Sequence, residues 1–161
     1  MQFTAPFISD PMPVEPQWID YNDHLNMAYY NVLMDRGVDQ LWDRLGFGID
    51  YRAQTGCTTF SAEYHMRYLR EIHLGDHVRA SFQLIDHTDK SFHFYQELIH
   101  ADGWVSARGE GLGLHVDQSG DTPRVAPMPA HILSGFQSLM RAHKSLPRPS
   151  TTGKPIAIRR K

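Results

Sequence analysis

Four polar side chains recur at every second position of one short stretch and form a candidate catalytic group. Asp20, Asn22, His24 and Asn26 directly precede a segment with helical periodicity. A turn with this spacing can direct a carboxylate, an amide and an imidazole into one small volume, beside the free N–H groups of a helix N-terminus. In such a place a carboxylate can act as a general base on water or attack a carbonyl carbon, while N–H donors bind the developing oxyanion.

The same residue types also have purely structural uses. Asp20 can cap a turn, and Asn22 and Asn26 are typical of turns and helix caps. His24 suits two roles equally well: a buried side chain that only makes hydrogen bonds, or a catalytic group. These readings stay open at the level of the stretch itself, so the surrounding elements must decide between them.

An amphipathic helix is predicted over residues 27–45. Gly46 suits its C-cap, and Gly37 costs about 1 kcal/mol relative to Ala, which a close approach to a sheet would offset. Asp35 and the other charged residues of this segment fall mostly on the side opposite the apolar stripe. That stripe recurs at steps of three and four residues: Tyr30, Met34, Val38, Leu41 and Leu45.

Beyond the helix the hydrophobic period changes to two, which predicts four long antiparallel strands. Their ranges are 57–69, 78–84, 91–100 and 104–116, with turn signals between them. Gly109, Gly111 and Gly113 leave one face of the last strand bare, and we expect the helix to lie against it.

The chain ends are less regular. Residues 14–19 form a short strand candidate that Pro16 weakens, and residues 130–143 form a second, short helix. Residues 1–145 are therefore predicted to be one domain. The Pro-containing basic tail, 146–161, is predicted to be poorly ordered or draped over a neighbouring surface.

The predicted fold class is α+β, with an antiparallel sheet wrapped around one long central helix. The open face and edges of such a sheet favour a homodimer or homotetramer.

Composition excludes several classes of function. The 161 residues carry a net charge of −2 and no obvious basic face, which argues against nucleic acid and anionic membranes as partners. No apolar run is long enough to span a membrane, no signal peptide is recognised at the N-terminus, and the single cysteine, Cys57, suits a reducing cytoplasm. There are ten histidines, but His73 and His77 flank a predicted turn, so we expect no metal and no cofactor.

Residues 14–129 resemble the hotdog-fold acyl-CoA thioesterases of the 4-hydroxybenzoyl-CoA type. The resemblance rests on Asp20 four residues before His24, followed by Leu-Asn-Met-Ala-Tyr over 25–29. The stretch is also similar to the active-site segment of plant-type acyl-ACP thioesterases. The chain departs from these patterns in having Met27 in place of a second Asn and Asp23 where many relatives have Gly.

A narrower resemblance links the chain to thioesterases of carnitine catabolism that hydrolyse betainyl-CoA. It is carried by the segments 63–71, 75–76, 114–117 and 126–129. The implied substrate has a trimethylammonium group, for which an aromatic cage with nearby acids is suitable.

The resemblance implies a role for each residue of the stretch. Asp20 is the general base or the nucleophile, and the backbone N–H of Met27 faces the thioester oxygen. Asn22 and Asn26 orient water or hold the loop, while His24 tunes Asp20 or donates to the thioester oxygen. We expect no cofactor and an acyl-CoA substrate.

Substrate contacts are expected from aromatic and charged side chains elsewhere. Trp18, Tyr29 and Tyr64 are candidates for the acyl pocket, although most aromatic residues belong to a core, and Glu63 is either a pocket carboxylate or an exposed residue of the other strand face. Three basic residues are candidates for the CoA phosphates: Arg67, Arg70 and Lys90.

Two other functions fit the same fold. One is a hotdog hydratase or dehydratase that uses His24 with a carboxylate. The other is a non-catalytic module that binds acyl-CoA or acyl carriers. The absence of thiol release would distinguish either from a thioesterase.

Overall fold

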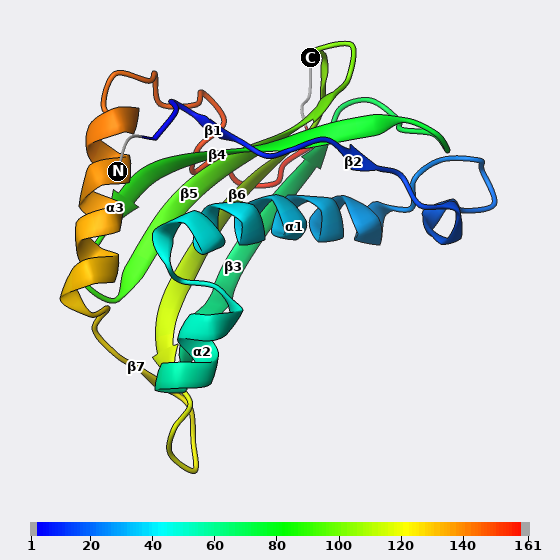
Figure 1. The fold of residues 1–161 in the computed structure, drawn as a ribbon. Helices are drawn as coiled ribbons and strands as arrows, with labels where there is room; N and C mark the ends of the chain where they lie inside the picture. Colours follow the sequence, from blue (N-terminus) through cyan, green and yellow to red (C-terminus); the bar gives the residue numbers. More distant parts are fainter. Residues whose placement is uncertain (1–2, 159–161) are drawn as a thin grey trace.

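An antiparallel sheet forms the centre of the computed structural model, which describes residues 3–158 (Figure 1). The central strands are ordered β1-β4-β5-β6-β3, while β2 pairs with β4 and β7 with β6. The strands are β1 (Phe7–Ile8), β2 (Met12–Pro13), β3 (Cys57–Tyr68), β4 (His77–His87), β5 (Ser91–His100), β6 (Val105–Asp117) and β7 (Arg124–Val125).

Helix α1 (Met27–Leu45) crosses the concave face of this sheet, as Figure 1 shows, and α3 (Ala130–His143) packs beside β4. The predicted central helix, the four long strands and the C-terminal helix are thereby confirmed. Strand β3 has one free edge, because β6 is its only partner among the described strands.

Local sequence explains where α1 begins and ends. Asn26 is the N-cap, and its side chain accepts a hydrogen bond from the N–H of Ala28. Gly46 closes the helix in the left-handed conformation, with φ of 70°. A Cβ atom on Gly37 would collide with that of Ala80 in β4, so the expected close approach of helix and sheet is present.

The glycine stripe of β6 does not receive the helix, contrary to the prediction. Aromatic rings from the neighbouring strands lie across it: Tyr64 over Gly109, and Phe94 over Gly111. Phe92 fills the space over Gly113 in the same way. The rings reach the stripe because they project from adjacent strands on the same face, and α1 packs on the rings.

A β-bulge determines which side chains of β3 face α1. Ser61 pairs with Gly113 and Tyr64 with Gly111, with the irregularity between Ser61 and Glu63. Directly paired residues share a face, so Ser61 and Tyr64 both point toward α1. Glu63 points to the outer face.

The predicted strand over 14–19 is wrong. Pro16 instead begins a one-turn 3-10 helix, η1 (Pro16–Trp18), and Ile19 only bridges to Leu25. The strands at this end of the chain lie earlier, as β1 and β2 on β4. A further helix, α2 (Ile49–Thr55), was not predicted, because seven residues are too few for a clear apolar period.

The C-terminal tail crosses the outer face of the sheet as far as it is described. Thr151 bonds to the Tyr95 hydroxyl (2.6 Å), and the N–H of Gly153 donates to both carboxylate oxygens of Glu110 (2.9 Å each). The basic residues 159–161 lie outside the described part. The domain boundary at 145 stays a prediction.

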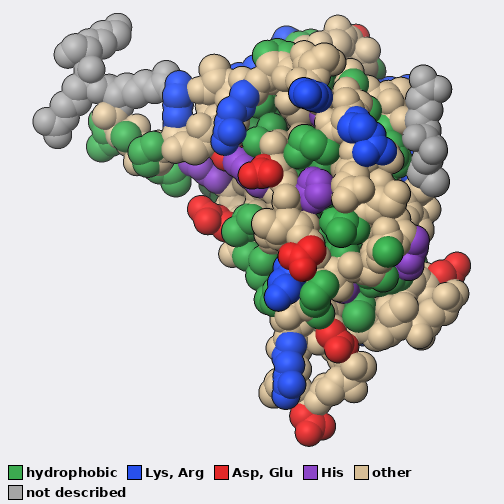
Figure 2. Space-filling model, turned by 90° about the vertical axis from the view of Figure 1, so that its left-hand side faces the viewer, with side chains coloured by type: hydrophobic (Ala, Val, Ile, Leu, Met, Phe, Trp, Pro, Cys, Tyr) green, Lys and Arg blue, Asp and Glu red, His purple; other side chains and the backbone are tan. Residues whose placement is uncertain are grey.

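Two further surface properties bear on partners. Figure 2 shows the α3 side, where basic, acidic and apolar side chains are intermixed, with Lys and Arg more frequent along the upper edge. None of the helices that the structure describes combines the length and the apolar composition that a membrane crossing requires.

Buried His143 makes the stability of the fold pH-dependent. Its Nδ1 accepts the N–H of Leu84 (2.9 Å) and its Nε2–H donates to the carbonyl of Thr4 (3.2 Å). Burial lowers the pKa of His143 below 6.5, so the unfolded chain binds a proton first as the pH falls. The contribution of His143 to the free energy of unfolding should be greatest above about pH 6.5 and should decrease as the pH falls below that value.

Urea titrations at about pH 7.5 and pH 5.5 measure this loss. In His143→Asn the amide oxygen can still accept from Leu84 but cannot titrate, so that variant should lose less stability between the two pH values. Equal losses in both proteins would contradict the prediction.

Candidate active site

Asp20 lies in a tight turn at the entrance to α1. The turn is closed by a bridge between Ile19 and Leu25 and by the Asp20 N–H, which donates to the carbonyl of His24 (2.9 Å). Asp20 Oδ1 accepts the N–H of Asn22 (2.8 Å) and, at longer range, that of His24 (3.4 Å). Its other oxygen, Oδ2, has no hydrogen-bond partner among the described residues. One oxygen therefore holds the turn, and the other is free for chemistry.

The start of α1 supplies an unused donor beside this turn. Asn26 is occupied as the N-cap, through Oδ1 and the N–H of Ala28 (3.0 Å). The next residue, Met27, is 65% exposed, and within residues 3–158 its N–H meets no acceptor. The N–H of Met27 thus lies at the positive end of the helix dipole, where it can bind an oxyanion.

Asn22 and His24 support this geometry in different ways. Asn22 is exposed and contributes its backbone N–H to Asp20. His24 is half-buried, and its ring meets the ring of His73 edge to face, with 5.1 Å between centroids. Both residues are in the turn with Asp20, as the sequence predicts, and their chemical roles stay predictions.

A cavity of about 310 Å³ adjoins the helix start. Its lining includes Tyr30, Tyr68 and Arg70. The Tyr68 hydroxyl donates to the carbonyl of Met27 (3.4 Å), and burial raises the pKa of Tyr30 and of Tyr68, so both are neutral donors. Arg70 stacks its guanidinium over Trp104 (4.0 Å to the ring centroid). Of the three predicted phosphate-binding residues, Arg70 is the one that lines this cavity.

Trp18 and Tyr29 pack beneath the turn. Their rings stack at 5.4 Å, the Trp18 ring is buried, and the guanidinium of Arg36 lies 4.7 Å from its centroid. The carbonyl of Trp18 accepts the N–H of Asn26 (2.9 Å). In this protomer Trp18 therefore supports the turn, while Tyr29 is only half-buried.

Other predicted residues lie away from the turn. Glu63 lines a cavity on the outer face, and Arg67 donates to the carbonyl of Lys154 in the tail (2.6 Å) on that same face. Lys90 is in the β4–β5 turn, at the opposite end of β4 from Asp76. The structure does not bring these three side chains to the Asp20 turn of the same protomer.

A third cavity, of about 100 Å³, lies between α1 and the free edge of the sheet. Asp35 is its acidic residue, and burial raises the pKa of that carboxyl. Tyr64, which donates to Gln96 (3.1 Å), is one of its aromatic walls. The other aromatic residues of the lining are Trp42, Phe60, Phe92 and Phe94.

Sequence reasoning missed Asp35 by placing it on the polar side of the helix. Among the described residues no Lys or Arg forms an ion pair with it, and an aromatic cavity with an unpaired carboxylate suits a cation. Within the same residues no group of three or more His, Cys, Asp and Glu side chains could hold a metal ion.

Comparisons with known proteins identify the family of this chain. Residues 14–136 match the family described as the Thioesterase-like superfamily. A betainyl-CoA thioesterase from Pseudomonas aeruginosa is 33% identical over 147 residues, which cover 91% of each chain. An L-carnitine dehydrogenase/betainyl-CoA thioesterase from Agrobacterium fabrum is 30% identical over 89% of this chain, which spans only 29% of that longer protein.

A solved structure matches over nearly the whole length. It is a Staphylococcus aureus protein in complex with CoA, with a TM-score of 0.84, 25% identity and 99% coverage of both chains. The fold of this chain is thus shared, over nearly its whole length, with a protein that binds CoA.

Proposed function

The chain belongs to the thioesterase-like superfamily and is an acyl-CoA thioesterase with the hotdog fold; from this premise we propose that it hydrolyses a small cationic acyl-CoA of the betainyl class. The observation that carries the proposal is the free Oδ2 of Asp20 beside the free N–H of Met27. We place the reaction in carnitine catabolism in the cytoplasm, in keeping with the carnitine dehydrogenase fused to one relative.

Two routes use this pair of groups. In the first, Asp20 takes a proton from water, the resulting hydroxide bonds to the acyl carbon, and the C–S bond breaks. In the second, Asp20 itself bonds to the acyl carbon, CoA thiolate leaves, and water then hydrolyses the mixed anhydride. In both routes the N–H of Met27 stabilises the oxyanion, and the thiolate is protonated on leaving.

The cavity at Asp35 supports a cationic acyl group. Trimethylammonium is bulky and apolar at its surface yet charged, so aromatic walls and one carboxylate satisfy it together. Each good cation–π contact stabilises by about 0.5–2 kcal/mol. Asp35 replaces Glu63 as the acid that we assign to this group.

Asp35 is too far from Asp20 of its own protomer for both carboxylates to contact the same acyl group. It lies eight residues beyond Met27 on α1, which is about 12 Å along the helix axis. The betainyl nitrogen is only two bonds from the thioester carbon. The acyl pocket must therefore come from a second copy.

The free edge of β3 offers the arrangement that brings two copies together. Tyr68, at one end of β3, contacts the helix start, whereas Phe60, near the other end, lines the Asp35 cavity. When two copies of an edge strand pair about a two-fold axis they run antiparallel, so the Tyr68 end of one copy meets the Phe60 end of the other. We propose this homodimer, whether alone or within a tetramer, with the turn of one protomer against the partner's Asp35.

Ala62→Pro tests the dimer. Ala62 is exposed at the bulge and has no paired position in β6, so proline there should disturb pairing with a second copy of β3 more than pairing within its own sheet. Sedimentation should give a dimer or tetramer for the natural chain and a monomer with little activity for the variant. A natural chain that is monomeric at full activity would contradict the proposal.

The activity itself is tested with a panel of acyl-CoAs assayed for free thiol, including betainyl-, short-chain, long-chain and benzoyl-CoA. Betainyl-CoA should be the best substrate. A preference for neutral long chains would reject the cationic pocket. Water addition to an enoyl-CoA without thiol release would instead indicate a hydratase, and tight binding without any turnover a binding module.

A further inference from the structure

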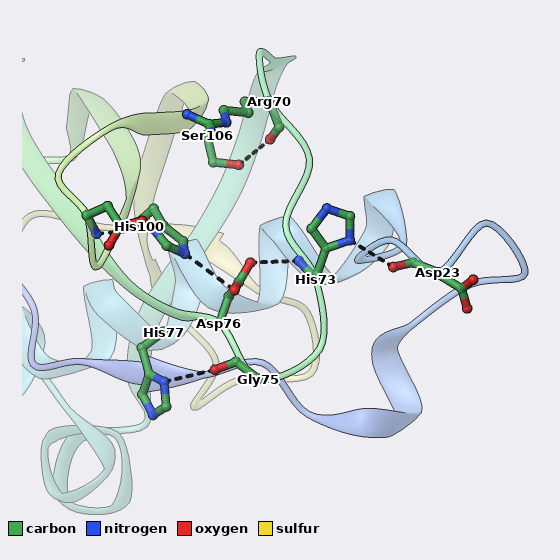
Figure 3. A network of polar contacts seen from close by, with 9 residues as sticks. Asp23, Arg70, His73, Gly75, Asp76, His77, His100 and Ser106 are labelled. Atoms are coloured by element: carbon green, nitrogen blue, oxygen red, sulfur yellow. Dashed lines mark hydrogen bonds and ion pairs between the residues drawn. The ribbon is translucent and has the colours of Figure 1, made fainter.

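The connection between β3 and β4 runs beside the catalytic turn and holds it at two successive residues. The carbonyl of Ile72 accepts the N–H of Leu25 (2.7 Å). The next residue, His73, bonds through Nδ1 to the carbonyl of Asp23 (3.1 Å), as Figure 3 shows. Because a carbonyl can only accept, His73 carries its proton on Nδ1 and donates it.

The bond to Asp23 falls on the most strained residue of the turn. Asp23 has φ of 60°, in the left-handed region that costs a side-chain-bearing residue about 1 kcal/mol or more. Its own N–H donates to the carbonyl of Asp20 (3.1 Å), and the following N–H, of His24, points to Asp20 Oδ1 (3.4 Å). The carbonyl of Asp23 and the N–H of His24 belong to one peptide group, so the orientation of that group affects one of the two N–H donors to the Asp20 carboxylate.

His73 is itself fixed from the sheet. Its backbone N–H donates to Asp76 Oδ2 (2.8 Å), and Asp76 Oδ1 faces Nε2 of His100 (3.4 Å). Since Nδ1 of His100 accepts the N–H of Asp102 (3.1 Å), the proton of a neutral His100 is on Nε2 and points toward Asp76. The His100 ring stacks on Trp104 at 4.3 Å between centroids.

We propose that His73 is a positioning residue of the thioesterase reaction, which holds the Asp20 carboxylate through the carbonyl of Asp23. The inference rests on the proposed role of Asp20. His73 touches neither the carboxylate nor the acyl group; it joins a turn with one strained residue to a connection anchored on β4 and β5. Its loss should lower the fraction of molecules in which Oδ2 is directed to the attacking water or to the acyl carbon, with little effect on CoA binding.

Two substitutions separate this role from simple packing. His73→Phe keeps a ring against His24 but removes the donor, while His73→Asn restores a side-chain N–H close to the position of Nδ1. His77→Phe is the matched control, because His77 is exposed and, within the described residues, its side chain bonds only to the carbonyl of Gly75, two residues away (3.2 Å). Figure 3 shows it on the side of Asp76 away from the turn.

His73→Phe should reduce kcat by about 10- to 100-fold, the effect of misplacing a reacting group by about 1 Å, with KM changed less than about twofold. His73→Asn should recover most of kcat, and His77→Phe should match the natural chain. Hydrogen exchange of the peptide that covers residues 22–25 should be faster in His73→Phe than in His73→Asn.

Three results would overturn the inference: an unchanged kcat in His73→Phe, a change confined to KM, or a His73→Asn variant as impaired as His73→Phe. A failure of the proposed function is distinguishable, because it would appear as normal turnover in Asp20→Asn whatever the His73 variants do.

Discussion

Asp20→Asn should abolish release of CoA while leaving the fold intact. The asparagine oxygen can still accept the N–H of Asn22, so the turn is retained, but the amide can neither take a proton from water nor attack the thioester. Loss of a general base lowers the rate by about 10²- to 10⁴-fold, and loss of a nucleophile by at least as much. A free-thiol assay at saturating substrate measures the effect.

Asp89→Asn controls for the lost charge. Asp89 is in the β4–β5 turn, and its carbonyl, not its carboxylate, bonds to the N–H of Met128 (2.7 Å). The turnover rate and melting temperature of Asp89→Asn should match those of the natural chain. Turnover of Asp20→Asn within a few-fold of that control would remove Asp20 from the reaction and the proposed mechanism with it.

The second large effect concerns the charge of the acyl group. Betainyl-CoA and 3,3-dimethylbutanoyl-CoA have the same shape and differ in whether nitrogen or carbon carries the three methyl groups. The natural chain should favour the cation by about tenfold or more in kcat/KM, the value of one or two good cation contacts. Asp35→Asn should bring the two substrates to within about threefold of each other.

Asp39→Asn is the matched control for Asp35, since it removes a carboxylate one helical turn further along α1 and outside the lining of the cavity. The preference of Asp39→Asn for the cationic substrate should equal that of the natural chain. Because burial raises the pKa of Asp35, the preference for the cation should also decline as the pH falls, beginning at a higher pH than an ordinary carboxyl would give. If the ratio of kcat/KM for betainyl-CoA to kcat/KM for 3,3-dimethylbutanoyl-CoA is the same in the natural chain and in Asp35→Asn, the proposed pocket is rejected.

Periodicity predicted the long elements because each of them buries one continuous face. Helix α1 repeats apolar residues over 19 positions between an Asn cap and a Gly cap, and β5 buries every second residue from Phe92 to Leu98, with Tyr95 buried in addition. Helix α2 and the strands β1, β2 and β7 are too short to show a period. Their existence depends on tertiary pairing, which the chain reveals only when folded.

The candidate site was predictable where it is local and not where it is assembled. Asp20 and Asn26 act within a few residues of themselves, so spacing was enough to identify the turn. Asp35 was missed because a helical wheel distinguishes an apolar side from a polar side and does not show which polar residues border a cavity at a sheet edge. His73 is nearly fifty positions from the turn, and its bond to Asp23 needs the β3–β4 connection to be folded.

The glycines of β6 also determine how this strand aligns with its neighbours. With Tyr64, Phe92 and Phe94 laid across Gly109, Gly111 and Gly113, a slip of one residue would turn Glu110 and Leu112 toward α1, where the rings already fill the space. A slip of two residues would leave one ring without a glycine beneath it. The stripe therefore selects one alignment of β6 against β3 and β5 during folding. That alignment also fixes the position of the free edge of β3 relative to the start of α1.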